Sequence, residues 1–347
     1  MDTKAIEAVA LSIRSLSMDA IQKANSGHPG LPLGAAEVAA VLYGELLKHN
    51  PADSKWADRD RFVLSAGHGS MLLYSILHLS GYKVSLDDIK SFRQIGSKCP
   101  GHPEYGETDG VECTSGPLGQ GIAAAVGMAI AENMLAARFN TPKHTIVDHY
   151  TYTLVGEGCL EEGVSSEASS LAGNLGLGKL IVFYDENKIS IDGNTDITFT
   201  DDIEKRYLSY GWQVLRGSMY NVGEIADLVE IAKRDTSKPS LIILKSVIGK
   251  GAPKQGTADV HGAPLGEEGC KAAKSALGIP TDEQFWVAPE AYKYFEEKRI
   301  EWAKAEENWN KTFAEWAKEN PELAKKWDAY WNHKATGDCE SPSYKAG

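Results

Sequence analysis

Cysteine is scarce in this sequence of 347 residues. Its five cysteines, at 99, 113, 159, 270 and 339, form no CxxC or other metal-ligand spacing. Their odd number and their scatter argue against a disulfide framework and favour reduced thiols in the cytoplasm. Positive charge is also deficient, because 36 Lys and Arg face 48 Asp and Glu and leave a formal net charge of −12. We therefore expect neither a nucleic acid nor an anionic membrane as a partner.

Other familiar patterns are missing as well. The sequence shows no signal peptide, no apolar run of transmembrane type, no internal repeat and no GxGxxG after its first strand candidate. We therefore expect neither a membrane protein nor a nicotinamide-binding Rossmann protein. What remains is an ordinary globular composition, with 42% hydrophobic residues and 34 glycines. The length suits one large α/β domain or two smaller ones.

The most informative stretch runs from residue 150 to residue 193. A β-rich apolar run at 150–155 breaks on Gly-Glu-Gly at 156–158, and a helical pattern then continues to about residue 174. A second apolar run at 179–184 ends in Asp-Glu-Asn at 185–187. This order predicts two parallel neighbouring strands joined by a helix. Both polar clusters should then lie at carboxyl ends of strands, where open α/β sheets bind their ligands.

The residue types in these clusters indicate the chemistry of the ligand. Glu157 offers a carboxylate between two glycines that allow close approach of a phosphate, and Asn187 offers an amide oxygen at the next strand end. Hard oxygen donors in small number suit Mg²⁺, or Ca²⁺ or Mn²⁺, bridging a diphosphate. The alternative is a glycine turn that carries a surface acid, and these residues alone leave both interpretations open.

Three histidines lie in turns rich in glycine or proline. His28 lies in SGHPG, His68 in SAGHGS and His102 in PGHPE. A single histidine in such a turn is more often a cap or a surface residue than a catalytic one. Three of them in turns, and none on a helix face, favour a shared site. His68 also precedes a helix, where free backbone N–H groups suit a phosphate.

The rest of the sequence alternates between helices and strands. Helices are expected at 3–24, 34–47, 70–79, 86–94, 121–138, 201–210, 222–233 and 270–277, and strands at 60–64, 213–215 and 240–247. This alternation predicts an α/β fold with a doubly wound, mostly parallel sheet flanked by helices.

The composition changes from about residue 280, where the sequence becomes helical, charged and rich in tryptophan. Trp302, Trp309 and Trp316 recur every seven residues, so they should lie on one helix face and pack against the domain or a partner. We expect an α/β domain at 1–279 and a helical C-terminal extension with a linker at 280–347.

The motifs, taken in order, resemble transketolase over almost the whole chain. SGHPG, GHPE and HGAPLG match that family, as does GCLEEGVSSEASSLAGNLGLGKLIVFYDENKISIDG. In addition, 28 residues (159–186) separate GEG from Asn187, similar to the thiamine-diphosphate signature of GDG followed some thirty residues later by Asn. Glu157 departs from the family's Asp by one methylene, which keeps the ligand chemistry. The resemblance implies the thiamine-diphosphate-binding fold and the diphosphate-binding half of a transketolase.

Site roles follow from this resemblance alone. The family's metal ligands fall on Glu157, on Asn187 and on the backbone carbonyl of Ile189. The implied cofactor-binding residues are His68, Gly116, Leu118, Glu157, Gly158, Asn187 and His261. The implied catalytic residues are His28, His102, His261 and Glu162, and the family places Glu162 at a dimer interface.

The resemblance also implies an activity of the pentose phosphate pathway. Thiamine diphosphate would supply a reactive carbon, and histidines would move protons while a two-carbon ketol unit passes between ketose and aldose phosphates. In the family the cofactor's aminopyrimidine binds a second domain, usually on the partner subunit of a homodimer. That domain is expected on a separate chain or outside this sequence. The extension resembles an interdomain spacer, which favours an excised domain over a natural split subunit.

Two other interpretations stay open. The chain could be a non-catalytic cofactor-binding or assembly module, inactive or nearly so by itself. It could also belong to another thiamine-diphosphate enzyme, such as a 2-oxoacid dehydrogenase α-subunit or a deoxyxylulose-phosphate synthase, although SGHPG and GHPE together argue against both.

Overall fold

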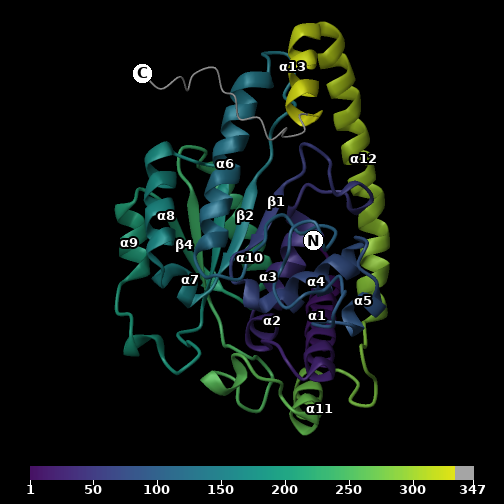
Figure 1. Ribbon diagram of the computed structural model, residues 1–347, viewed down its shortest axis with the longest axis vertical. Helices are drawn as coiled ribbons and strands as arrows, with labels where there is room; N and C mark the ends of the chain where they lie inside the picture. Colours follow the sequence, from purple (N-terminus) through teal and green to yellow (C-terminus); the bar gives the residue numbers. More distant parts are fainter. Residues whose placement is uncertain (333–347) are drawn as a thin grey trace.

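The centre of the structure is a five-stranded sheet in which all strands run parallel (Figure 1). This computed structural model describes residues 1–332, so the linker expected at the end of the chain lies outside the described residues. The strands are β1 (Arg61–Leu64), β2 (Thr151–Val155), β3 (Leu180–Glu186), β4 (Gln213–Ser218) and β5 (Ser240–Lys245), in the spatial order β1-β2-β3-β5-β4. The expected pairing of β2 with β3 is confirmed.

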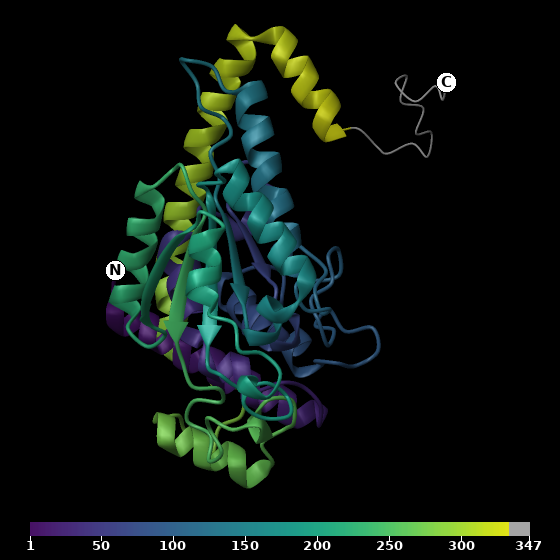
Figure 2. The same ribbon diagram turned by 90° about the vertical axis from the view of Figure 1, so that its left-hand side faces the viewer.

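Helices cover both faces of the sheet. They are α1 (Thr3–Ala24), α2 (Gly30–Gly34), α3 (Ala36–Val41), α4 (Ser70–Ser80), α5 (Leu86–Lys90), α6 (Gln120–Phe139), α7 (Glu157–Glu161), α8 (Gly163–Leu175), α9 (Ile203–Ser209), α10 (Val222–Arg234), α11 (Glu267–Leu277), α12 (Pro289–Glu319) and α13 (Pro321–Asn332). Figure 2 shows α6 and α8 on one side of the sheet and α10 on the other, and α10 packs against α1 and α3. The doubly wound α/β prediction is confirmed, and so is the helical C-terminal region.

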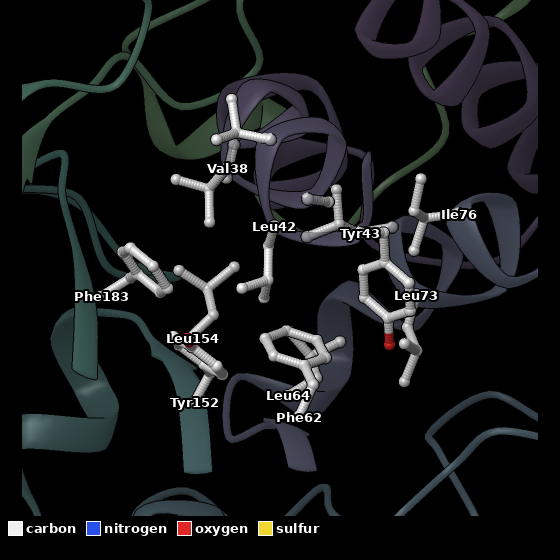
Figure 3. Close-up of a cluster of buried hydrophobic side chains, with 14 of the residues drawn as sticks. Val38, Leu42, Tyr43, Phe62, Leu64, Leu73, Ile76, Tyr152, Leu154 and Phe183 are labelled. Carbon is white, nitrogen blue, oxygen red and sulfur yellow. The ribbon is translucent and has the colours of Figure 1, made fainter. Parts of the chain in front are cut away.

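The core lies between the sheet and the layer formed by α1, α3 and α4. Strands β3 and β5, which are buried on both faces, carry the continuous apolar runs 180–184 and 241–244 instead of an alternating pattern. Figure 3 shows part of this core, including Val38, Leu42, Tyr43, Phe62, Leu64, Leu73, Ile76, Tyr152, Leu154 and Phe183. The sheet is therefore a rigid support for the loops at its carboxyl edge.

Helix α6 is long and apolar enough, by length and composition alone, to cross a membrane. In the fold it packs against β1, β2 and α8 as a layer of the α/β core. Its Glu132 is buried and accepts a hydrogen bond from Lys179 at 2.7 Å. A paired carboxylate in such a position is typical of the interior of a globular protein.

Some element boundaries were predicted wrongly. The helix expected at 34–47 is interrupted: α2 ends at Gly34, α3 follows, and a π-helical turn occupies Leu42–Leu46. The helix expected after Gly158 is interrupted at Glu162, whose extended backbone (φ −73°, ψ 138°) separates α7 from α8. Strand β3 extends to Glu186. Asp185 and Glu186 of the polar cluster 185–187 therefore belong to the strand, and only Asn187 follows it. Periodicity cannot locate such breaks, because tertiary packing decides them.

The tryptophan stripe of α12 packs against the domain. Trp302 lies 4.1 Å from His49 between ring centroids, while the indole N–H groups of Trp309 and Trp316 donate to the carbonyls of Ile146 and Phe139 at 3.0 and 2.9 Å. The prediction of a packing stripe is confirmed. The division into 1–279 and 280–347 stays a prediction.

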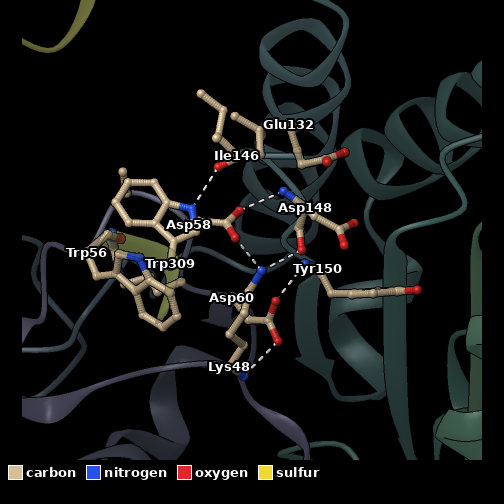
Figure 4. Close-up of polar contacts among 12 residues, drawn as sticks. Lys48, Trp56, Asp58, Asp60, Glu132, Ile146, Asp148, Tyr150 and Trp309 are labelled. Carbon is tan, nitrogen blue, oxygen red and sulfur yellow. Dashed lines mark hydrogen bonds and ion pairs between the residues drawn. The ribbon is translucent and has the colours of Figure 1, made fainter. Parts of the chain in front are cut away.

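A polar network holds the amino ends of β1 and β2 together (Figure 4). Asp60 accepts hydrogen bonds from the backbone N–H of Lys48 at 2.9 Å and from that of Tyr150 at 2.7 Å. Asp58 accepts from the N–H of Asp148 at 2.6 Å. These bonds fix the register of two strands whose carboxyl ends lead into the His68 turn and the Glu157 turn.

Candidate functional site

A cavity of about 500 Å³ opens at the carboxyl edge of the sheet, where the sequence predicted it. Its lining comes from the turns after β1, β2 and β3, from the loop before α6, from the segment after α1 and from the loop after β5. The lining residues are His28, Leu31, His68, Gly116, Leu118, Gly156, Glu157, Gly158, Cys159, Glu161, Asp185, Asn187, Ile189, Ser190, Ile191, Asp192, Ile197, Thr198, Ile248 and His261. Every site residue expected from the sequence is in this set except His102 and Glu162.

The four expected histidines form one cluster. The ring centroid of His28 lies 5.2 Å from that of His68, 5.9 Å from that of His261 and 6.3 Å from that of His102. The rings of His68 and His261 stack at 5.2 Å. His102 lines a neighbouring open pocket and packs close to Gly116. Segments more than two hundred residues apart thus supply one imidazole-lined wall.

These histidines are neutral at pH 7. Burial, together with the positive charge of Arg93 and of the neighbouring histidines, lowers the pKa of His28 to about 4. Burial and the other three histidines lower the pKa of His68 to about 3. Burial also lowers the pKa of His102 and of His261. Each neutral ring offers one nitrogen as a donor and one as an acceptor.

Arg93 is a site residue that the sequence reasoning missed. Its guanidinium donates to Ser26 Oγ at 2.8 Å and lies 3.4 Å from His28 Nδ1. It therefore ties the His28 turn to the loop that carries His102, and its own backbone has the left-handed φ of 60°. Its position beyond the short helix α5 gave no signal, because the contact spans 65 residues.

Glu157 is buried at the first turn after β2. One carboxylate oxygen, Oε1, accepts from the backbone N–H of Lys188 at 2.6 Å, and the other, Oε2, accepts from the hydroxyl of Tyr184. Burial raises the pKa of Glu157, and these two hydrogen bonds oppose the rise. The surface-acid interpretation is therefore wrong, since the side chain is only 7% exposed and faces the cavity.

Asn187 is held in place by its neighbours. Its side-chain N–H donates to Asp185 Oδ2 at 3.0 Å, and its Oδ1 accepts from the N–H of Ile189 at 2.9 Å. Asp185 is itself buried and accepts from Ser246, and burial raises its pKa to about 6. Asp185 belongs to the polar cluster expected at this strand end, whereas Tyr184 is a further site residue without a separate sequence signal, because it lies within the apolar run of β3.

The turn after Asn187 is strained. Lys188 adopts φ 63°, a left-handed conformation that glycine takes more readily. The backbone carbonyl of Lys188 accepts from the N–H of Thr195 at 3.1 Å, and Ser190 N–H donates to Gly193 at 2.7 Å. These two bonds flank Ile189 and fix its backbone beside the cavity.

Glu162 is exposed at the break between α7 and α8 and does not line the cavity. It lies against Gly119, where an added Cβ would come within 2.7 Å of the Glu162 Cβ. The preceding residue, Glu161, does line the cavity, and its buried Oε1 finds no hydrogen-bond partner within residues 1–332.

The donors fit a divalent metal and a diphosphate. The expected ligand set is one carboxylate, one amide oxygen and one backbone carbonyl, which suits Mg²⁺ better than a softer metal. No group of three or more His, Cys, Asp or Glu within the described residues could hold a metal by itself. Buried Nδ1 of His261 has no hydrogen-bond partner among residues 1–332, so it is free to meet a ligand.

The charge of the lining fits the same pair of ligands. Glu157, Glu161, Asp185 and Asp192 line the cavity, and the described lining contains no lysine or arginine. A diphosphate would meet only like charge there, so it needs a bound cation to enter.

Comparison with known proteins gives the family. A family model described as transketolase, thiamine diphosphate binding domain, matches residues 5–335. The chain is 66% identical over 330 residues to the transketolase of Treponema pallidum (strain Nichols), covering 95% of this chain and 50% of that protein. It is 53% identical over 348 residues to the transketolase of Geobacillus stearothermophilus, covering 99% and 52%.

Solved structures agree. Transketolase from Leishmania mexicana superposes with a TM-score of 0.92 at 46% identity, covering 93% of this chain and 49% of that one. A transketolase complex with sedoheptulose 7-phosphate from Pichia stipitis gives a TM-score of 0.91 at 48% identity, covering 94% and 48%. The fold is thus that of thiamine-diphosphate-binding α/β domains. The chain belongs to the transketolase family and spans about half the length of the curated relatives it matches.

Proposed function

We propose that this chain is the half of a transketolase that binds the diphosphate of thiamine diphosphate together with Mg²⁺, Ca²⁺ or Mn²⁺. The observation that carries the proposal is the cavity lined by Glu157, Asn187 and three neutral histidines, with His102 beside them at 6.3 Å from His28 between ring centroids. The substrates are then a ketose phosphate and an aldose phosphate, between which a two-carbon ketol unit is transferred.

Glu157, Asn187 and the carbonyl of Ile189 would hold the metal. Both oxygens of Glu157 already accept one hydrogen bond each, and each keeps a second lone pair for a cation. Asp185 orients the Asn187 amide through a hydrogen bond to its nitrogen, which directs the oxygen to the other side. Gly158 and Gly116 leave room at the wall for the bound molecule, since a Cβ on Gly158 would come within 2.9 Å of Leu118.

The role of the histidines under this proposal is hydrogen bonding and proton transfer. Bound thiamine diphosphate supplies the reactive carbon that accepts the ketol unit. His28, His102 and His261 are neutral, so under this proposal each can donate a hydrogen bond to a sugar oxygen through its N–H and accept a proton from a hydroxyl at its other nitrogen. His68 stacks on His261 and adjoins His28, and under this proposal it would contact the diphosphate.

A second, pyrimidine-binding domain completes the site under this proposal, either on a separate chain or in a longer protein of which this sequence is a part. Support comes from the curated relatives, which are about twice as long. We further propose a homodimer in the cytoplasm. The four cysteines among residues 1–332 are free thiols, which agrees with a reducing compartment.

The test is titration calorimetry with thiamine diphosphate and Mg²⁺, followed by an assay of ketol transfer. The isolated chain should bind weakly and turn over little or nothing, because it offers diphosphate contacts without a pyrimidine pocket. Adding the pyrimidine-binding half of a transketolase should tighten binding and restore transfer. Tight binding by the chain alone, or no gain with the second half, would contradict the half-site.

Glu157 variants test the metal ligand. Glu157→Ala should abolish metal-dependent cofactor binding because it removes the only expected carboxylate ligand. Glu157→Asp should preserve or improve it, since the carboxylate is kept. Normal cofactor binding by Glu157→Ala would show that the metal is held elsewhere.

A further inference from the structure

Within residues 1–332, Tyr184 makes the one side-chain hydrogen bond to the carboxylate of Glu157. Its hydroxyl donates to Oε2, while the backbone N–H of Lys188 donates to Oε1 at 2.6 Å. Tyr184 is 1% exposed and pairs in register with Val155, two residues before Glu157. Its ring is thus fixed in the sheet at the height of the Glu157 turn.

The hydrogen bond from Tyr184 matters because the glutamate side chain at position 157 is long and flexible. A glutamate has one more rotatable bond than an aspartate, so ordering its carboxylate costs more conformational entropy. An aspartate carboxylate would also end roughly 1.5 Å, one C–C bond, closer to the backbone. A shorter side chain at position 157 therefore withdraws from the Tyr184 hydroxyl, and the contact belongs to the glutamate.

We propose that Tyr184 is a positioning residue that fixes the longer Glu157 side chain in the conformation that binds the metal. The inference rests on the proposed function, because it takes Glu157 as a metal ligand. Tyr184 and Lys188 N–H each occupy one lone pair of the carboxylate and hold its plane, and a lone pair on each oxygen remains for the cation. Hydrogen-bond partners of this kind typically change metal affinity by 10- to 100-fold.

A double-mutant cycle tests the inference on the 347-residue chain. Binding of Mn²⁺ is followed by electron paramagnetic resonance in the presence of excess thiamine diphosphate, up to millimolar metal. Tyr184→Phe should weaken Mn²⁺ binding by about 10-fold in the Glu157 background. In the Glu157→Asp background the same substitution should change it less than about twofold.

Tyr207→Phe is the matched control. Tyr207 is also a buried tyrosine, 2% exposed, whose hydroxyl pairs with Ser169 at 2.9 Å outside the cavity lining. It should leave Mn²⁺ binding unchanged, whatever it does to the melting temperature of the metal-free protein. Melting curves of all metal-free variants separate loss of folding from loss of affinity.

The outcomes are distinct. Equal effects of Tyr184→Phe in both backgrounds, or no effect in either, overturn the positioning role while Glu157 remains a ligand. Normal Mn²⁺ binding by Glu157→Ala, or none by the wild-type chain, instead overturns the proposed metal site, and the inference fails with it.

Discussion

His68 shows what burial does to a single residue of this site. Burial is the main cause of its lowered pKa, because a proton on the ring would put a positive charge in a poorly solvated space, 5.2 Å from the rings of His261 and His28. The folded protein therefore keeps His68 neutral down to a pKa of about 3, whereas the unfolded chain takes up the proton near pH 6.5.

This difference predicts a pH dependence of stability. Between pH 6.5 and about 4 the unfolded state binds the extra proton, so stability is lost as the pH falls. His68→Asn should reduce that loss by up to about 1.4 kcal/mol per pH unit. Urea unfolding followed by tryptophan fluorescence at several pH values measures the two slopes. Parallel slopes for variant and wild type would show that His68 titrates alike in both states.

The comparison with the variant is needed because other groups act in the opposite direction. Burial raises the pKa of Asp60 and of Asp185 to about 6, so the folded state binds their protons first and gains stability as the pH falls. The wild-type curve alone would mix these contributions.

The site residues differ in how clearly the sequence alone indicated their roles. The glycine and proline turns around His28, His68 and His102 were recognisable from composition, and the family resemblance gave their roles. Arg93 and Tyr184 were not, because their importance lies in contacts to segments far along the chain. No local pattern records such a contact.

At the scale of elements, the start of α6 is fitted tightly to the end of β1. Ser65 Oγ accepts from the N–H of Ile122 at 3.0 Å, and a Cβ on Gly121 would come within 2.4 Å of the Ser65 backbone. The approach brings the loop with Gly116 and Leu118 to the cavity wall. Only glycine, which has no Cβ, allows this close approach to Ser65 at position 121.

Gly121→Ala should therefore destabilise the protein by about 1–3 kcal/mol, since the added methyl forces α6 away from β1. Gly127→Ala, on the same helix, is the control. Apart from its chain neighbours and its own helix backbone, no atom among residues 1–332 lies within 4 Å of the methyl it would add, so it should stabilise by about 0.5–1 kcal/mol through helix propensity. Urea midpoints measure both. A destabilising Gly127→Ala or a neutral Gly121→Ala would contradict this account of the contact.

The order of elements followed from the sequence, but their interruptions did not. The alternation of apolar runs and helical periods gave the parallel sheet, because buried parallel strands are continuous apolar runs. The breaks at Ala35 and Glu162 interrupt stretches whose local pattern is helical throughout. Packing of neighbouring elements decides these positions, and a single sequence carries no local sign of it.

At the scale of the whole molecule, exposed apolar side chains lie on two helices that pack against each other, namely Met134 on α6 and Val164, Leu171 and Leu175 on α8. The three α8 residues recur at seven and four positions and so share one helix face. Glu162 lies at the start of this helix. On the proposed function, this surface is where a second copy of the chain binds.

Leu171→Asp should weaken the homodimer at least about 10-fold, because it places a charge in an apolar interface at a position with little role in the core. Ile300→Asp, at an exposed position of α12, should leave it intact. Analytical ultracentrifugation decides. A wild-type monomer at tens of micromolar, roughly the scale of a modest interface, would refute the dimer.

The acidic lining of the cavity has a consequence for how the two ligands depend on one another. On the proposed function, four carboxylates and no lysine or arginine in the described lining would repel a diphosphate, while one carboxylate, one amide and one carbonyl would hold a cation only loosely. The cation then offsets the negative charge that repels the diphosphate, and the diphosphate supplies further oxygen ligands to the cation. By thermodynamic reciprocity, the factor by which the metal tightens the cofactor must equal the factor by which the cofactor tightens the metal. On this account the metal and the cofactor bind as a coupled pair instead of at two independent sites.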